Sequence, residues 1–164
     1  MLQTLQKNLP GRLGELGLKG ATLADYANEC GVVDSFLFLG HVPDPENVLF
    51  SCDVLVKPTR EDNPWGRDII ESLHFGRPVI TIGTWGVFVI NGETGLLHAK
   101  FDAAAMAEDI IKLSDDRILC KSIGTAGQTL IANLCSPKER AADLLGVWQR
   151  AAADFDGKAK ILAS

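Results

Sequence analysis

Several features that define other protein classes are missing from this sequence of 164 residues. No apolar run approaches the roughly 20 residues needed to span a bilayer, and residues 1–10 are too polar for a secretory signal peptide. The four cysteines lie far apart without CxxC spacing, which favours idle thiols in a reducing compartment over disulfides or a metal site. These absences predict a cytoplasmic protein, at most peripheral to a membrane.

Basic charge and a glycine-rich dinucleotide motif are missing as well. The formal net charge is −5, whereas a nucleic-acid surface normally carries a basic excess. No G-x-G-x-x-G segment follows an apolar run, so a nicotinamide-dependent dehydrogenase is not expected. What is present is an ordinary composition, 46% hydrophobic and 23% charged, in a chain long enough to bury one core.

Short apolar runs alternate with stretches of helical character. Residues 35–39, 53–57 and 78–82 each contain neighbouring apolar residues rather than a strict apolar–polar alternation, which is typical of strands covered on both faces of a parallel sheet. Helices are expected over residues 21–30, 45–51 and 64–75, the last capped by Asn63 with Pro64 at its first position. This order predicts an α/β fold, a doubly wound Rossmann-like parallel sheet with helices on both faces.

The C-terminal half is mostly helical. After a short edge strand at residues 95–97, Asp102 can cap a helix to about residue 113, and further helices are expected over residues 117–134 and from residue 136 onward. We therefore divide the chain into a poorly defined segment 1–20, a domain 21–155 and a frayed tail 156–164.

The loop after the second apolar run is the most informative candidate site. Ligands of open α/β sheets bind beyond the carboxyl ends of the strands. Here the loop enters a helix near Gly66, where free backbone N–H groups favour a phosphate and a glycine permits its close approach. Arg67 can add a positive charge, and Glu71, one turn later, can accept hydrogen bonds from the hydroxyls of a ribose.

Structural alternatives explain the same residues. Asn63 could serve only as a helix cap, Trp65 could pack on a neighbouring helix, and Arg67 with Glu71 could form an exposed ion pair worth a few tenths of a kcal/mol. The spacing alone leaves both interpretations open.

Six segments of the chain follow one another in a characteristic order. Residues 38–42 read FLGHV, and residues 52–59 read CDVLVKPT. NPWG at 63–66, ESLHFGRPVI at 71–80, NGETGLL at 91–97 and the helix expected near Asp102 follow. Together these segments resemble the C-terminal domain of the retaining GT-B glycosyltransferases of family 4, also called group 1. The patterns of that family are F-x-G-x-v, a-D-v-x-v-x-P-S and E-G-F-G-x-x-x-x-E-A-x-a-x-G-x-P-V-I.

This resemblance implies roles for individual residues. Glu71 would hold the ribose of a nucleotide-sugar donor, and Pro64, Trp65 and Gly66 would line its diphosphate and sugar. Val42 would lie where backbone groups meet the base. The family implies no metal and no other cofactor.

The sequence also departs from the family pattern. Asn63 replaces the first glutamate of the E-x7-E motif, and the turn at residues 83–87 lacks the acidic residue often found there. The family's first strand and its basic pair have no counterpart, so Arg12 and Lys19 are expected to be solvated surface charges. The acceptor-binding domain is not expected in this chain.

We therefore expect a donor-binding domain that binds a nucleotide-diphosphate sugar for retaining transfer and is weakly active or inactive alone. Its expected partners are a separate acceptor-binding domain or chain and, through an exposed sheet edge, a second copy of itself. One alternative is a non-catalytic nucleotide-binding or assembly module, favoured by Asn63 and the missing acidic residue. Another is a different Rossmann-like enzyme such as a sugar-nucleotide epimerase.

Overall fold

The computed structural model describes residues 22–162, so Arg12 and Lys19 lie outside the described residues. The chain divides into two units, Met1–Pro45 and Glu46–Ser164, and each is described by itself. All four cysteines are within the described part, and none forms a disulfide.

The first unit contains a short helix, α2 (Leu23–Glu29), and one 3-10 turn, η3 (Val33–Ser35). A reciprocal cap begins α2: the Thr22 hydroxyl accepts from the Asp25 N–H at 3.1 Å, and the Asp25 carboxylate accepts from the Thr22 N–H at 2.8 Å. The helix ends before Gly31, whose φ of +69° suits a helix terminus.

The expected buried strand at residues 35–39 is wrong. Residues 36–39 have no regular secondary structure, and the side chains of Phe36 and Leu37 are largely exposed. A strand exists only where neighbouring backbone groups complete its hydrogen bonds. The described sheet does not include this segment, so its apolar sequence alone is insufficient to make it a strand.

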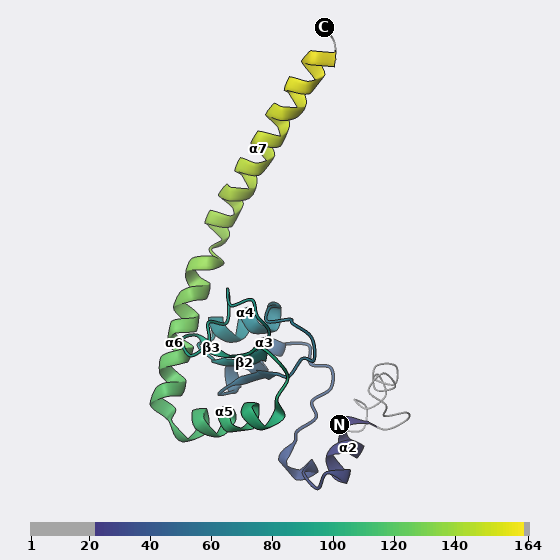
Figure 1. Ribbon diagram of the computed structural model, residues 1–164, viewed down its shortest axis with the longest axis vertical. Coiled ribbons are helices and arrows are strands. Elements are labelled where there is room, and N and C mark those ends of the chain that lie inside the picture. Colours follow the sequence, from purple (N-terminus) through teal and green to yellow (C-terminus); the bar gives the residue numbers. More distant parts are fainter. Residues whose placement is uncertain (1–21, 163–164) are drawn as a thin grey trace. The chain divides into compact units, whose positions relative to one another are not determined.

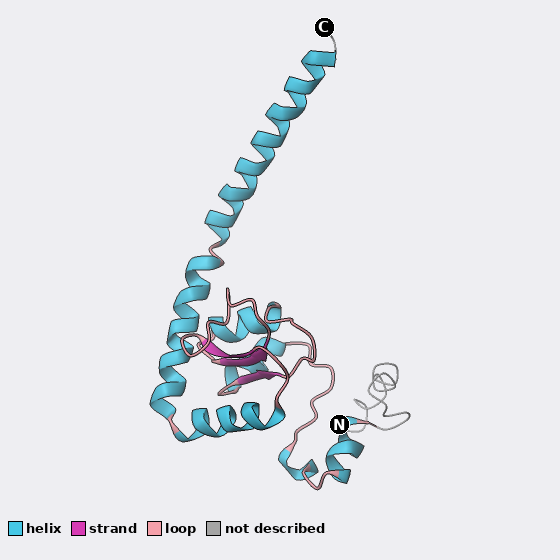
Figure 2. Cartoon of the chain, viewed as in Figure 1, coloured by secondary structure: helices cyan, strands magenta, loops and turns pink. Residues whose placement is uncertain are grey.

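The second unit is built on a parallel sheet of three strands. They are β1 (Leu55–Lys57), β2 (Val79–Ile82) and β3 (Gly95–His98), in the spatial order β1-β2-β3. Leu55 pairs with Val79, and Thr81 pairs with Leu97. Figure 2 shows these strands at the centre of the unit. The parallel sheet and the edge position expected for the third of these strands are confirmed.

Helices cover both faces of this sheet, as Figure 1 shows for α4 and α5. Ile80 and Ile82 of β2 belong to a buried cluster with Met106 and Leu113 of α5 (Ala103–Asp115). Val79 points to the other face and joins a second cluster that includes Ile69 and Leu73 of α4 (Arg67–His74). Alternate side chains of β2 therefore pack against helices on opposite faces of the sheet. The predicted doubly wound α/β class is confirmed.

The remaining helices lie close to the positions expected from the sequence. Asp102 caps α5 by accepting from the N–H groups of Ala104 and Ala105. The fourth helix of the second unit, α6 (Arg117–Leu134), contributes Ile123 to the first core cluster and Ile131 to the second. The first and last helices of this unit are α3 (Pro45–Ser51) and α7 (Pro137–Leu162), and α7 continues past the expected fraying point at Asp156. Within residues 22–162, no helix is both long and apolar enough to cross a bilayer.

Glycine permits α6 to approach the end of α4 closely. A Cβ atom on Gly124 would collide with the carbonyl oxygen of Gly76, which is backbone and cannot rotate away. The side chain of Gln128 strengthens the same contact by donating to the carbonyl oxygen of His74 at 2.8 Å.

Gly124→Ala is therefore expected to destabilise the protein by about 1–3 kcal/mol, the usual cost of overpacking. Urea unfolding followed by circular dichroism measures this. The control is Gly146→Ala on α7, where the added Cβ would meet only the guanidinium of Arg150 at 3.5 Å. Alanine there should stabilise the helix by up to about 1 kcal/mol. Equal stability of Gly124→Ala and the wild type would contradict the close approach.

Candidate functional site

Two loops follow neighbouring strands at the carboxyl edge of the sheet. Residues 58–66 follow β1, and residues 83–87 follow β2. Asp62 of the first loop accepts hydrogen bonds from both the backbone N–H (3.0 Å) and the hydroxyl of Thr84 in the second. The edge where ligands of such folds bind is thus formed by two loops that are tied together.

Close packing at Gly83 reinforces this tie. A Cβ atom on Gly83 would lie 2.5 Å from the ring of Pro64 and 2.7 Å from the Asp62 carboxylate. The N–H of Gly83 donates to the carbonyl oxygen of His98 at 2.8 Å, which joins the second loop to the end of β3. Any side chain at position 83 would force the two loops apart.

Lys57, the last residue of β1, holds the other end of the first loop. Its ammonium donates to the carbonyl oxygen of Trp65 at 2.9 Å and lies 3.1 Å from both carboxylate oxygens of Asp68. The Lys57 side chain is only 19% exposed, so water competes weakly for these contacts. The Lys57 ammonium therefore fixes the backbone just before α4.

The start of α4 differs from the sequence-based expectation. The helix begins at Arg67 rather than at Pro64, and the residue before it is Gly66 with φ +141° and ψ 167°. Asn63 does not cap the helix, because the position that would carry a capping side chain is a glycine. Gly66 supplies no side-chain oxygen, so no side chain at the N-cap satisfies the N–H groups of the first turn.

Arg67 and Glu71 lie one turn apart on α4 and contact each other. The Arg67 guanidinium donates to the Oε1 atom of Glu71 at 2.7–2.8 Å, and this hydrogen bond raises the pKa of Arg67 above its usual value. Arg67 is 86% exposed and Glu71 is 29% exposed. Because both contacts use Oε1, the second carboxylate oxygen of Glu71 retains its capacity to accept hydrogen bonds.

Six of the seven predicted site residues come together at this edge: Asn63, Pro64, Trp65, Gly66, Arg67 and Glu71. Pro64 is buried, whereas the side chain of Trp65 is more than half exposed. Val42 belongs to the first unit, so its role at the base stays a prediction. No three His, Cys, Asp or Glu side chains gather into a possible metal site in the described part of the chain.

Sequence reasoning missed the residues that fix the loops, namely Lys57, Asp62, Asp68 and Thr84. One signal was available for Lys57, since a lysine that ends an otherwise apolar strand requires a nearby partner. No comparable signal existed for Asp62 and Thr84, which are 22 residues apart.

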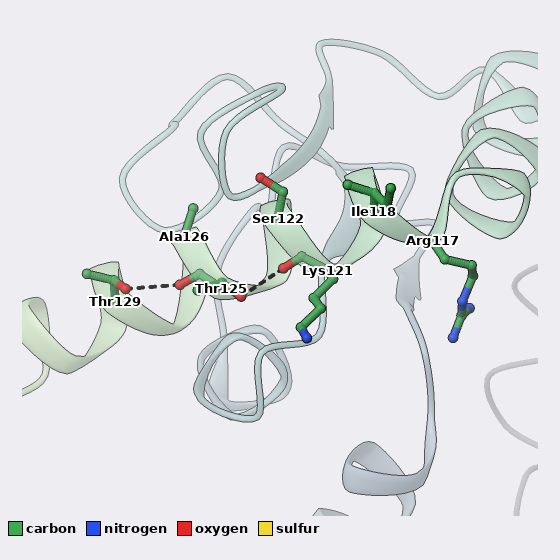
Figure 3. Close-up of a pocket in the computed structure, with 7 residues that line it drawn as sticks. All are labelled: Arg117, Ile118, Lys121, Ser122, Thr125, Ala126 and Thr129. Atoms are coloured by element: carbon green, nitrogen blue, oxygen red, sulfur yellow. Dashed lines mark hydrogen bonds between the residues drawn. The ribbon is translucent and has the colours of Figure 1, made fainter.

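A hollow lies along one side of α6, and Figure 3 shows the side chains that line it. They all come from that helix: Arg117, Ile118, Lys121, Ser122, Thr125, Ala126 and Thr129. Arg117 pairs at 2.6 Å with Asp53, which precedes β1 and so lies toward the amino end of the strand. None of the predicted site residues lines this open surface.

Residues 12–116 match the family model described as "Glycosyl transferases group 1". The chain belongs to this family. One relative, the capsular polysaccharide biosynthesis glycosyltransferase CapM of Staphylococcus aureus, is 36% identical over 99 residues, 59% of this chain and 26% of that protein. The glycogen synthase of Mycobacterium tuberculosis is 31% identical over 122 residues, 70% of this chain and 29% of that protein. This group 1 chain thus spans less than a third of the curated relatives it matches.

Solved structures support the fold of this group 1 chain. The sucrose-phosphate synthase of Thermosynechococcus elongatus superimposes with a TM-score of 0.70 at 27% identity, over 78% of this chain and 33% of that one. Anabaena HepE in complex with UDP-glucose gives a TM-score of 0.69 at 20% identity, over 86% of this chain and 38% of that one. The similarity identifies the chain as a GT-B type α/β fragment corresponding to the C-terminal half.

The tie between Asp62 and Thr84 is expected to depend on pH. Hydrogen bonds from the Thr84 side chain and backbone lower the pKa of Asp62 below its ordinary value. Because the pKa is lower in the folded state, these hydrogen bonds contribute fully to the stability of the fold above the unfolded pKa of about 3.9. This contribution is lost as the pH falls through the folded pKa.

Carbon-13 shifts of the Asp62 carboxyl, followed by NMR from neutral pH downward, should give a midpoint below about 3.9. Thr84→Val, which keeps the shape and removes the hydroxyl, should move this midpoint upward. An unchanged midpoint in Thr84→Val would show that the hydroxyl does not contribute.

Proposed function

We propose that this chain is the donor-binding part of a retaining glycosyltransferase and binds a nucleotide-diphosphate sugar at the carboxyl edge of its sheet. The observation that carries the proposal is the uncapped start of α4 directly after Gly66, in a chain of the group 1 family. A helix N-terminus with unused N–H groups attracts an anion, and the diphosphate is the anionic part of such a donor.

The charges around this helix start support a diphosphate there. Asp68 lies in the first turn and would repel a phosphate, but Lys57 neutralises it at 3.1 Å. Arg67 is exposed and adds a cation whose remaining guanidinium N–H groups can donate to the ligand while its contact with Glu71 is kept. In this proposal Arg67 and the helix dipole stabilise the negative charge that develops on the leaving diphosphate, without a requirement for a metal.

Glu71 is proposed to hold the ribose. It lies one turn beyond Arg67 on α4, and its Oε2 atom can accept from a ribose hydroxyl while Oε1 keeps its contact with Arg67. Asn63, within the loop that precedes α4, is proposed to bind hydroxyls of the donor sugar through its amide. Val42 is proposed to approach the base through its backbone.

The acceptor is proposed to bind to another domain or chain. This chain spans 26% of CapM and 38% of HepE, and closing a donor site against a second domain is what excludes water from the reaction. HepE is described in complex with UDP-glucose, which makes UDP the first nucleotide to test. A second copy is a further proposed partner, because β1 pairs on one side only within the described sheet.

A non-catalytic nucleotide-binding or assembly module is the second candidate. Asn63 stands where the family pattern has a glutamate, and residues 83–87 hold no acidic side chain. Such a module, whether or not it binds a nucleotide, would support no transfer when a complete acceptor domain is supplied.

Calorimetric titration with UDP, GDP and ADP tests the donor site. One nucleotide should bind, and Glu71→Ala should weaken it by roughly ten- to a hundredfold, the effect of losing a charged hydrogen bond of about 1.5–3 kcal/mol. Glu108→Gln, an exposed carboxylate on α5, is the matched control and should bind as the wild type does. Failure of all three nucleotides to bind would overturn the donor-site proposal.

The isolated chain is expected to transfer sugar poorly or not at all. Incubation with UDP-glucose, GDP-glucose or ADP-glucose and a simple glycoside, followed by measurement of the released nucleotide diphosphate, checks this expectation. Efficient turnover by the pure chain would contradict this expectation, because it would require an acceptor site within this chain. Light scattering at high protein concentration tests the second copy, and a strictly monomeric species would contradict it.

A further inference from the structure

Trp85 is an aromatic side chain at the carboxyl edge to which the donor proposal gives no role. It lies in the loop that follows β2, one residue after the Thr84 that binds Asp62. Nearly half of its side chain, 48%, is exposed. An exposed tryptophan at the edge where this fold binds ligands is a candidate contact for the substrate itself.

The ring of Trp85 contacts Phe88, and hydrogen bonds fix the backbone that precedes it. Its centroid lies 5.5 Å from that of Phe88 at an interplanar angle of 87°, an edge-to-face contact. Phe88 packs against the buried cluster around Val79 and Val89. The backbone before Trp85 is fixed by the bonds of Thr84 to Asp62 and of Gly83 to His98. A ligand that stacks on this ring therefore meets a surface that is already ordered and loses little conformational entropy.

The position of Trp85 along the site favours a sugar over a nucleobase. The proposed phosphate position is the start of α4 at Arg67, and Glu71, proposed for the ribose, lies one turn further along this helix. Trp85 is joined instead to the other side, because Thr84 binds Asp62, the residue before Asn63. Asn63 is the group proposed to bind sugar hydroxyls, so the ring lies toward the glycosyl end of the donor.

The chemistry of a pyranose fits such a ring. One face of a pyranose presents several C–H groups and is apolar, whereas its hydroxyl groups point outward around the rim. The C–H face can cover the exposed indole and remove apolar area from water. The rim hydroxyls then remain available to polar groups such as the Asn63 amide.

We propose that Trp85 is a stacking platform for a pyranose ring of the substrate, held rigid by Phe88 and by the Thr84–Asp62 tie. This inference rests on the proposed function for the orientation of the ligand. The pyranose is either the glycosyl group of the donor or a sugar of the acceptor, since both meet at the transferred bond.

The donor arm of the test compares nucleotides with nucleotide sugars by calorimetry. UDP, GDP and ADP, and the glucose, galactose and mannose derivatives of the one that binds, are titrated into the wild type, Trp85→Ala and Trp85→Phe. The expected result is that Trp85→Ala weakens one nucleotide sugar about tenfold, a typical effect of losing a stacked ring. The affinity for the nucleotide alone should stay within about twofold, and Trp85→Phe should recover part of the loss.

The acceptor arm uses methyl glycosides of glucose, galactose and mannose and observes the Trp85 indole N–H by NMR. A shift of this signal in the wild type, together with an unchanged nucleotide-sugar affinity in Trp85→Ala, assigns the platform to the acceptor. Trp148→Ala, an exposed tryptophan on α7, is the control and should change neither measurement. Thermal unfolding of each variant separates a loss of binding from a loss of fold.

Two results would overturn the platform. Equal weakening of the nucleotide and the nucleotide sugar in Trp85→Ala would mean that the ring stacks on the base. No effect in either arm would mean that no pyranose uses the ring. If the wild type binds no nucleotide, the donor proposal fails separately and the acceptor arm alone tests the platform. A shift of the Trp85 indole signal with a methyl glycoside then supports the platform, and the absence of any shift overturns it.

Discussion

The architecture depends on the burial of β2 on both of its faces. All four of its residues are buried, and a strand with two covered faces needs helices on either side of the sheet. Thr81 is the one polar member, and its hydroxyl donates to the carbonyl oxygen of Lys57 in the neighbouring strand at 3.2 Å. The positions of α4 and α5, and the shared carboxyl edge of β1 and β2, follow from this central strand.

The same strand determines where the site can form. β1 and β2 are parallel, and their residues pair from Leu55 with Val79 to Lys57 with Thr81. The loops that follow the two strands therefore leave the sheet side by side. Lys57 is the last residue of β1, so its side chain reaches the end of the first loop and the first turn of α4. The cation neutralises Asp68 there, and the start of the helix remains suited to an anion.

Much of the second unit could be predicted from the sequence because its signals are local. Asp102 and Asp116 accept hydrogen bonds from the helices that follow them, and both precede strongly helical stretches. The apolar runs at 53–57 and 78–82 contain strands because their backbone groups pair with neighbouring strands. The run at 35–39 carries the same pattern but no pairing, and a pattern does not reveal whether a neighbour exists.

At the candidate site, residue types were easier to predict than their contacts. The Arg67–Glu71 spacing places both on one side of α4, and the structure brings them into contact. The start of α4 was harder, because Pro64 and Asn63 resemble a helix start while Gly66 adopts a conformation that delays it. Lys57 with Asp68, and Asp62 with Thr84, depend on tertiary structure that no local rule describes.

Gly66 ends the first loop of the candidate site and Gly83 begins the second, and both limit how such a site can change in evolution. A Cβ atom on Gly83 would collide with the ring of Pro64, and the φ of +141° at Gly66 is strained for any other residue, so substitution at either position would disturb the scaffold itself. Trp65 and Trp85 lie next to these positions, but their side chains are largely open to solvent. Natural drift or directed evolution can thus exchange the exposed rings while the linked loops keep their shape, which separates the evolvability of ligand choice from the robustness of the fold.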